Sequence, residues 1–137
     1  VVTHKLIVQL VLKMEDVRTH FPLMMVPTVD MTSLPDLIQR HPGVRLILMN
    51  NYSTLRGETL SKIAQKENVY FDISHAEQVG ALEKMTNSVP YTKLLFGSHA
   101  PFFYLEAALL KFKESELGET MTHAIQFGNA ERLLNEQ

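Results

Sequence analysis

Four short apolar runs, each followed by a segment with helical periodicity, organise this chain. The first two runs are almost continuously apolar, which is typical of strands that are buried on both faces of a parallel sheet. Leu, Ile, Ala or Met side chains at helical spacing predict the segments between them as helices. The predicted strands are 6–12, 44–50, 69–74 and 93–98, and the predicted helices are 34–41, 55–68, 75–88 and 104–117, with one or two more over 119–136.

This alternation predicts an α/β protein with a parallel sheet and right-handed crossovers, formed by a single domain over 1–137. Two architectures contain such units: a small doubly wound open sheet and half of an eight-stranded barrel. Periodicity does not choose between them. In both, ligands bind at the carboxyl ends of the strands. The long connection over 13–35 carries Met, Phe and Val throughout, so we expect it to be packed.

Helix signals flank several of these segments. Thr32 or Ser33 can cap the first helix, and Pro42-Gly43 ends it. Ser74 can cap the third helix, with Glu77 completing a capping box. His75 would then lie in the first helical turn and face solvent.

Polar residues accompany the first predicted strand and the loop after it. Gln9 stands inside the strand, where it needs either a hydrogen-bond partner in the core or a place on the wall of a cleft. Asp16 and Arg18 follow the strand. Arg18 could grip a substrate carboxylate with two hydrogen bonds. The alternative is that Asp16 and Arg18 pair with each other or with the backbone to order the loop.

The next two strands end in amides and a carboxylate. Asn50 and Asn51 could hold a substrate or an oxyanion, although Asn also suits a turn. Asp72 alternates with Phe71 and Ile73, so it faces away from both. A buried carboxylate is costly unless it has partners, which makes Asp72 a better site candidate than a surface acid.

The last strand stops at Gly97-Ser98 and presents His99 before a proline. A neutral imidazole at this edge can act as a base, an acid or a metal ligand. The alternative is a loop histidine without a role. The chain lacks a phosphate-binding loop, a dinucleotide glycine fingerprint and a nucleophile elbow.

Composition excludes several classes of protein. The net charge of −2 leaves no basic surface for nucleic acid, and the absence of cysteine excludes disulfides and thiolate metal sites. No apolar run approaches the length of about 20 residues that a membrane helix needs. We therefore expect no nucleic-acid or membrane partner and, by default, a cytoplasmic protein.

The stretches LLFGSHAPFFYLEAALLKF and IQFGNAERLL resemble the carboxyl end of the amidohydrolase-related (amidohydrolase 2) family. These are metal-dependent hydrolases and decarboxylases on the (β/α)8 barrel. The matching positions are Gly97-Ser98, Pro101-Phe102, Gly128-Asn129-Ala130 and Leu133-Leu134. The resemblance implies that the chain is the second half of such a barrel.

The resemblance also shows departures at three positions. The family's metal ligands on the corresponding strands are replaced here by Gln9, Asn50 and His99. Amides bind divalent transition metals far less well than imidazoles do. The resemblance alone would imply a metal such as zinc, but with these replacements we predict no bound metal or other cofactor. His99 would instead act as a metal-free acid or base at the barrel mouth, with Asn50 as an electrophilic donor.

Together these features predict a hydrolase that cleaves a C–N, lactone or ester bond in a small carboxylated substrate. Two alternatives remain: a barrel that has lost catalysis and serves as a binding or assembly module, and a small open sheet whose resemblance is accidental. Half a barrel would expose two sheet edges, so we also expect self-association or a complementary barrel half. The predicted site consists of the catalytic residues His99, Asn50 and Asp72 and the substrate-binding residues Gln9, Asp16, Arg18 and Asn51.

Overall fold

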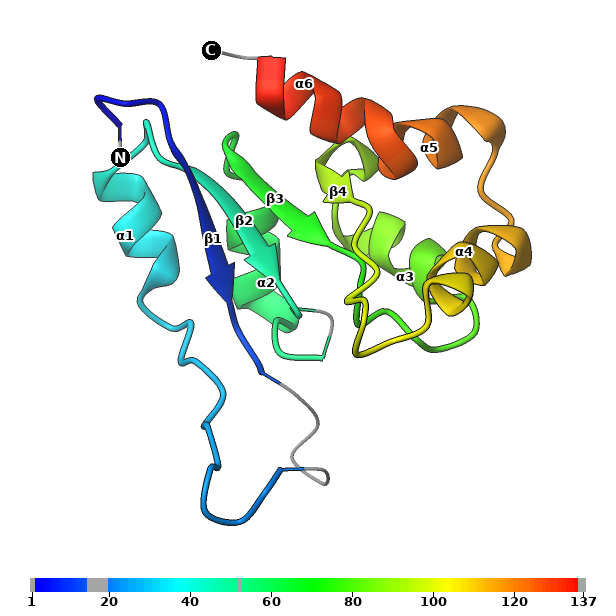
Figure 1. Ribbon diagram of the computed structural model, residues 1–137. Coiled ribbons are helices and arrows are strands. Elements are labelled where there is room, and N and C mark those ends of the chain that lie inside the picture. Colours follow the sequence, from blue (N-terminus) through cyan, green and yellow to red (C-terminus); the bar gives the residue numbers. More distant parts are fainter. Residues whose placement is uncertain (1, 15–19, 52, 136–137) are drawn as a thin grey trace.

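The computed structural model describes residues 2–14, 20–51 and 53–135. In this part of the chain, four parallel strands form a sheet in the order β1-β2-β3-β4. The arrows of β1, β2 and β3 run side by side in one direction (Figure 1). The predicted α/β fold with four parallel strands is confirmed. The strands are β1 (Ile7–Val11), β2 (Arg45–Met49), β3 (Val69–Asp72) and β4 (Leu94–Leu95).

The strand order separates the two predicted architectures. In a doubly wound sheet the order reverses at a switch point, so the first strand lies inside the sheet. Here each strand pairs with the next one in the sequence, as along the wall of a (β/α)8 barrel. The chain therefore forms a barrel-like arc rather than a doubly wound sheet.

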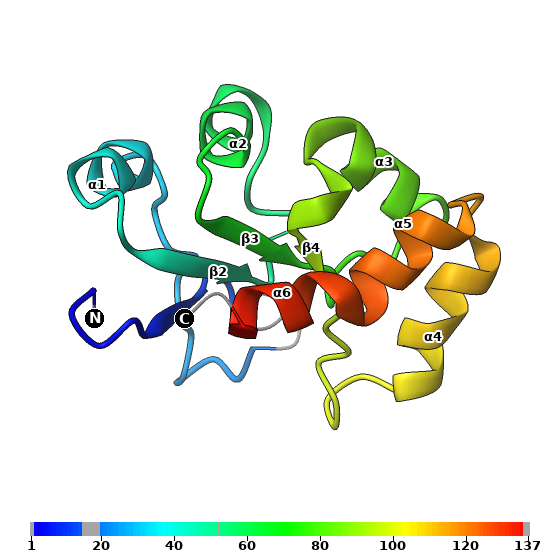
Figure 2. The same ribbon diagram turned by 90° about the horizontal axis from the view of Figure 1, so that it is seen from above.

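Helices lie on both sides of this sheet. Helices α1, α2 and α3 line one side, here called the outer face, and α6 crosses the other side, the inner face (Figure 2). No helix formed by the described residues is both long and apolar enough to cross a membrane. The helical elements are α1 (Leu34–Arg40), α2 (Gly57–Ala64), α3 (Ala81–Ser88), the 3-10 turn η1 (Tyr91–Lys93), α4 (Leu105–Glu114), α5 (Glu119–His123), the π-helical turn η2 (Ala124–Gly128) and α6 (Asn129–Asn135).

The main hydrophobic core lies between the outer face and the helices. Leu48 and Phe71 are fully buried there, together with Ile63 of α2 and Leu82 of α3. Burying a side chain of this kind contributes about 1.5–3 kcal/mol relative to leaving it in water. This core holds β2, β3 and β4 at the centre of the molecule.

Helix α6 covers part of the inner face. Leu133 of α6 packs on Tyr70 and Leu95 there. On β1, by contrast, Gln9 is exposed and Val11 is 38% exposed. The prediction that the first strand is buried on both faces is therefore wrong, because no described element covers the carboxyl half of its inner face.

The third helix starts later than its sequence suggests. α3 begins at Ala81, and Gly80 before it takes a left-handed conformation with φ 67°. The predicted capping box of Ser74 and Glu77 is wrong, because the Ser74 hydroxyl donates instead to Asn50 from another strand. The segment between β3 and α3 is thereby free to form an irregular loop at the carboxyl end of the sheet.

The long connection after β1 also differs from its prediction. Its described part between residues 21 and 30 is exposed throughout, and Leu23 is 86% exposed. Packing resumes at Met31, which is buried in the main core just before α1. The expectation of a packed connection is therefore wrong for most of this described part.

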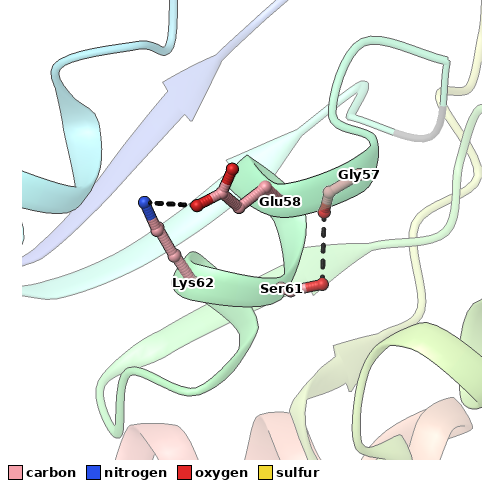
Figure 3. Close-up of polar contacts among 4 residues, drawn as sticks. All are labelled: Gly57, Glu58, Ser61 and Lys62. Atoms are coloured by element: carbon pink, nitrogen blue, oxygen red, sulfur yellow. Dashed lines mark hydrogen bonds and ion pairs between the residues drawn. The ribbon is translucent and has the colours of Figure 1, made fainter.

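The second helix is stabilised on its solvent side. Lys62 lies 2.8 Å from the carboxylate of Glu58 one turn earlier, and the Ser61 hydroxyl donates to the carbonyl of Gly57 at 3.2 Å (Figure 3). The ion pair lowers the pKa of Glu58 and raises that of Lys62. Both side chains are exposed, so the pair supports the helix locally rather than the core.

A buried amide joins α6 to the start of β4. The side-chain nitrogen of Asn129 donates to the carbonyls of Tyr91 at 2.7 Å and Leu94 at 2.8 Å. Asn129 is almost fully buried, and its bond to the Leu94 carbonyl lies in the interior. The GNA stretch of the sequence thus has a structural role in placing α6 under the sheet.

Replacing Asn129 with alanine should lower the free energy of unfolding by about 2 kcal/mol, because the buried Leu94 carbonyl and the partly buried Tyr91 carbonyl lose their donor. Urea unfolding followed by circular dichroism measures this change. Asn135→Ala, at an exposed position of the same helix, is the matched control and should have little effect. Equal midpoints for the two variants would contradict the role assigned to Asn129.

Candidate functional site

A buried carboxylate organises the carboxyl ends of the central strands. Asp72, at the end of β3, is only 5% exposed on the inner face. Its Oδ1 accepts the backbone N–H of Asn50 at 2.8 Å, and its Oδ2 accepts that of Ser74 at 3.2 Å. Backbone N–H groups supply the partners that a buried carboxylate needs. We call Asp72, Asn50, Asn51 and Ser74 the Asp72 network.

The two asparagines complete this network in different ways. Asn50 has a left-handed backbone with φ 55°, which Asn tolerates better than most residues. Its side chain donates to the carbonyl of Lys13 at 2.7 Å and accepts the Ser74 hydroxyl at 3.1 Å. The Asn51 amide donates to the carbonyls of Leu48 at 2.9 Å and Asp72 at 3.0 Å. Both amides therefore tie strand ends together, and their roles toward a substrate stay predictions.

Gly97 lets β4 approach this carboxylate closely. A Cβ atom added to Gly97 would lie 2.6 Å from Oδ2 of Asp72 and 3.4 Å from Cβ of Ser74. Any side chain here would push the chain after β4 away from β3. The Gly97-Ser98 step therefore brings the following residue, His99, to the edge of the Asp72 network.

His99 does not stand alone at this edge. Its ring packs edge-on against that of His75 with 4.8 Å between the centroids, and Phe103 lies 5.1 Å from His75 and 4.9 Å from His99. His99 has a left-handed backbone with φ 56°. We call His75 and His99 the imidazole pair. Both are half-buried, so His75 is not the solvent-facing residue that the helix prediction implied.

Burial and charge keep His75 neutral. Desolvation lowers its pKa most, and the neighbouring His99 and Lys13 lower it further. The carboxylates of Asp72 and Glu77 act in the opposite direction but do not outweigh the burial. A neutral imidazole at pH 7 can both donate and accept a proton, as acid–base chemistry requires.

A lysine from α4 fixes the loop that carries His75. Lys111 donates to the carbonyls of Ile73 at 3.2 Å and Ser74 at 2.7 Å, and burial lowers its pKa. A further bond, from the N–H of Ala76 to the carbonyl of Ile73 at 3.1 Å, closes a turn around His75. The position of the His75 ring is therefore set by the fold and not by a mobile loop.

The remaining predicted residues are placed as follows. Gln9 is exposed on the inner face of β1, which agrees with a place on a cleft wall and not with a satisfied core amide. Asp16 and Arg18 lie outside the described residues.

Sequence reasoning did not assign a site role to His75, Ser74 or Gly97. A signal was present, since all three lie at or next to the carboxyl ends of predicted strands, but local helix and turn patterns explained them first.

The resemblance implies a bound metal, so we asked whether side chains of the described residues could hold one. Among the described residues, no group of three or more His, Asp or Glu side chains is arranged to hold a metal ion. The oxygens of Asp72 are already occupied by backbone N–H groups. These residues do not fit a metal centre, so no chemical step is assigned to one.

A hollow lies away from the imidazole pair. About 380 Å³ of space opens between α2 and α3, with Asn51, Arg56 and Lys84 among its lining residues. It lies on the helix side of the sheet, and no imidazole lines it. The imidazole pair and this hollow are therefore separate features of the molecule.

The contact between Gly97 and Asp72 makes a specific prediction. Gly97→Ala should lower the free energy of unfolding by about 1–3 kcal/mol, because the added methyl group overlaps a buried carboxylate. Gly118→Ala is the control: nothing lies within 4 Å of its added Cβ, so the change should stay below about 1 kcal/mol. Thermal unfolding of both variants measures these changes. A Gly97→Ala variant as stable as the wild type would contradict the close packing of Gly97 on Asp72.

Comparison with known proteins gives similarity in structure only. No protein-family model matches the chain, and no curated protein matches it in sequence. Amidohydrolase 2 from Bifidobacterium longum subsp. infantis is similar over 77% of this chain and 46% of its own, with a TM-score of 0.61 and 16% identity. 5-Carboxyvanillate decarboxylase LigW from Sphingomonas paucimobilis is similar over 73% and 36%, with a TM-score of 0.58 and 15% identity.

A third similar structure is 2,6-dihydroxybenzoate decarboxylase from Rhizobium, with a TM-score of 0.56 and 19% identity over 71% of this chain and 36% of that one. The chain thus spans between about a third and a half of the length of these proteins. Identities this low show a common fold. The chain has the fold of part of the barrel found in amidohydrolase 2 proteins and related decarboxylases.

Proposed function

We propose that this chain forms part of a barrel enzyme, of hydrolase or lyase type, that acts on a small carboxylated substrate at the carboxyl ends of its strands. The observation that carries the proposal is the imidazole pair, which the fold places beside the Asp72 network. His99 is the proton-transfer group. His75, Phe102 and Phe103 surround its ring, with centroids between 4.8 and 5.4 Å away.

The chemistry of both reaction types calls for such a group. Hydrolysis of an amide, lactone or ester needs a base that takes a proton from water and an acid that gives one to the leaving group. Decarboxylation needs an acid that delivers a proton to the carbon that loses carbon dioxide. An imidazole can accept or donate a proton and so serves either purpose, typically with a contribution of about 10²–10⁴-fold to the rate.

The surroundings of His99 suit a planar acid. Phe102 is 82% exposed and Phe103 half-buried, so aromatic faces border the imidazole. The charge of Lys13, at the end of β1, reaches His75 and favours an anionic substrate group. Two of the similar structures are decarboxylases of 2,6-dihydroxybenzoate and 5-carboxyvanillate, both of which are carboxylated aromatic molecules. Arg18 stays a predicted carboxylate ligand.

The proposal concerns a site that other parts of a barrel would complete. The chain spans only part of the similar proteins, and the carboxyl half of the inner face of β1 is uncovered by the described residues. That self-association or a complementary half covers this face stays a prediction. A second candidate function is a barrel that binds without catalysis, which the missing three-ligand cluster among the described residues favours.

His99→Asn tests the proposed role. Asn accepts the left-handed backbone of this position but cannot transfer a proton at neutral pH, so turnover should fall by at least about 100-fold while thermal stability stays near that of the wild type. The assay offers hydroxybenzoates and aromatic lactones and follows their ultraviolet absorbance. His41→Asn, at the exposed end of α1, is the control and should retain full turnover.

Unchanged turnover in His99→Asn would remove His99 from the mechanism. A wild-type protein that binds benzoate but converts none of these substrates would favour the non-catalytic barrel.

A further inference from the structure

One nitrogen in the candidate site has no hydrogen-bond partner. Nε2 of His75 is shielded from solvent, and no described residue forms a hydrogen bond with it. The side chains of the Asp72 network are already engaged, because they bond to one another or to backbone groups. The network therefore supplies no partner for this atom.

Such an atom is unusual in a folded protein. Buried polar groups nearly always have a partner, because burying one without a partner forfeits its bonds to water. Exceptions often mark a position where a ligand supplies the partner. A loose loop does not explain this one, since Asp72 and Lys111 bind the backbone of Ser74 just before His75, and the N–H of Ala76 just after it donates to the carbonyl of Ile73.

The ring of His75 is also held in place by its neighbours. His99 contacts it edge-on at 4.8 Å, and Phe103 lies against it at 5.1 Å, tilted by 46°. A molecule that reaches His99 therefore comes within reach of His75 as well. These contacts place the unpaired nitrogen beside the proposed proton-transfer group and not in a separate part of the molecule.

We propose that His75 is a ligand-binding residue whose Nε2–H donates a hydrogen bond to a carboxylate oxygen of the molecule bound beside His99. This inference rests on the proposed function, because it takes that molecule to be a small carboxylic acid. The lowered pKa of His75 agrees with a neutral donor. Lys13 adds a positive charge, whereas Asp72 already has its own donors and does not compete for this hydrogen.

The test uses benzoate as the probe. In wild-type protein labelled with 15N-histidine, added benzoate should shift the Nε2 resonance of His75 and leave that of the exposed His41 unchanged. His75→Phe keeps a ring against His99 and Phe103 but removes the donor, so it should weaken benzoate binding at least tenfold without lowering the melting temperature. His75→Gln retains an N–H donor and should recover part of the affinity.

Two outcomes would overturn the inference: equal affinity in His75→Phe and wild type, or a His75 resonance that does not move when benzoate binds. The resonance measurement uses the wild type, so it tests the contact between His75 and benzoate even if His75→Phe does not fold. A wild-type protein that binds no benzoate overturns the inference as well.

Failure of the proposed function is distinguishable from failure of the inference. If benzoate moves the His75 resonance but no substrate is turned over, the catalytic proposal alone fails. If turnover depends on His99 but benzoate leaves His75 unmoved, the assignment of His75 alone fails.

Discussion

The buried carboxylate of Asp72 is the interaction on which the candidate site depends. A charge in this position requires donors, and the chain supplies them from the backbone of Asn50 and Ser74. Satisfying the carboxylate therefore fixes where β2 ends and how the chain leaves β3. Gly97 allows the end of β4 to close on the same group. The imidazole pair is a consequence, because His75 and His99 directly follow Ser74 and Ser98.

Much of this arrangement could be predicted from the sequence. The apolar runs indicated the strands, and alternation correctly placed Asp72 on the face opposite Phe71. The strand-end rule directed attention to Asn50, Asp72 and His99, and the structure brings these residues to one edge. The resemblance in the GNA stretch has a physical basis as well, since Asn129 anchors α6 to the start of β4.

The predictions from the sequence were wrong where a contact with a distant part of the chain overrides a local sequence pattern. Ser74 and Glu77 fit a capping box, but the Ser74 hydroxyl bonds to Asn50, 24 residues earlier in the chain. That long-range bond delays α3 and moves His75 from a predicted helical turn to the site. The apolar composition of β1 predicts burial on both faces. Burial also requires a helix or strand that covers each face. A short stretch of sequence contains no information on the late start of α3 or on the exposure of β1, because both depend on residues far away in the chain.

The similar structures and the chemistry of this site give different kinds of information. The fold is that of part of a barrel shared with amidohydrolase 2 proteins and decarboxylases. The described side chains, however, engage their carboxylate with backbone donors, and two imidazoles in mutual contact lie beside it. In the proposed mechanism, Asp72 shapes the site, His99 transfers the proton and His75 binds the carboxylate of the bound molecule.

The most direct test of this account is amide hydrogen exchange, measured by nuclear magnetic resonance, in the wild type and in Asp72→Asn. The account predicts slow exchange of the Asn50 and Ser74 N–H groups in the wild type. The variant has only one acceptor oxygen, so at least one of these N–H groups should exchange at least about tenfold faster, while Leu48 inside β2 is unchanged. Exchange that is equally slow in both proteins would contradict the central role of the Asp72 carboxylate.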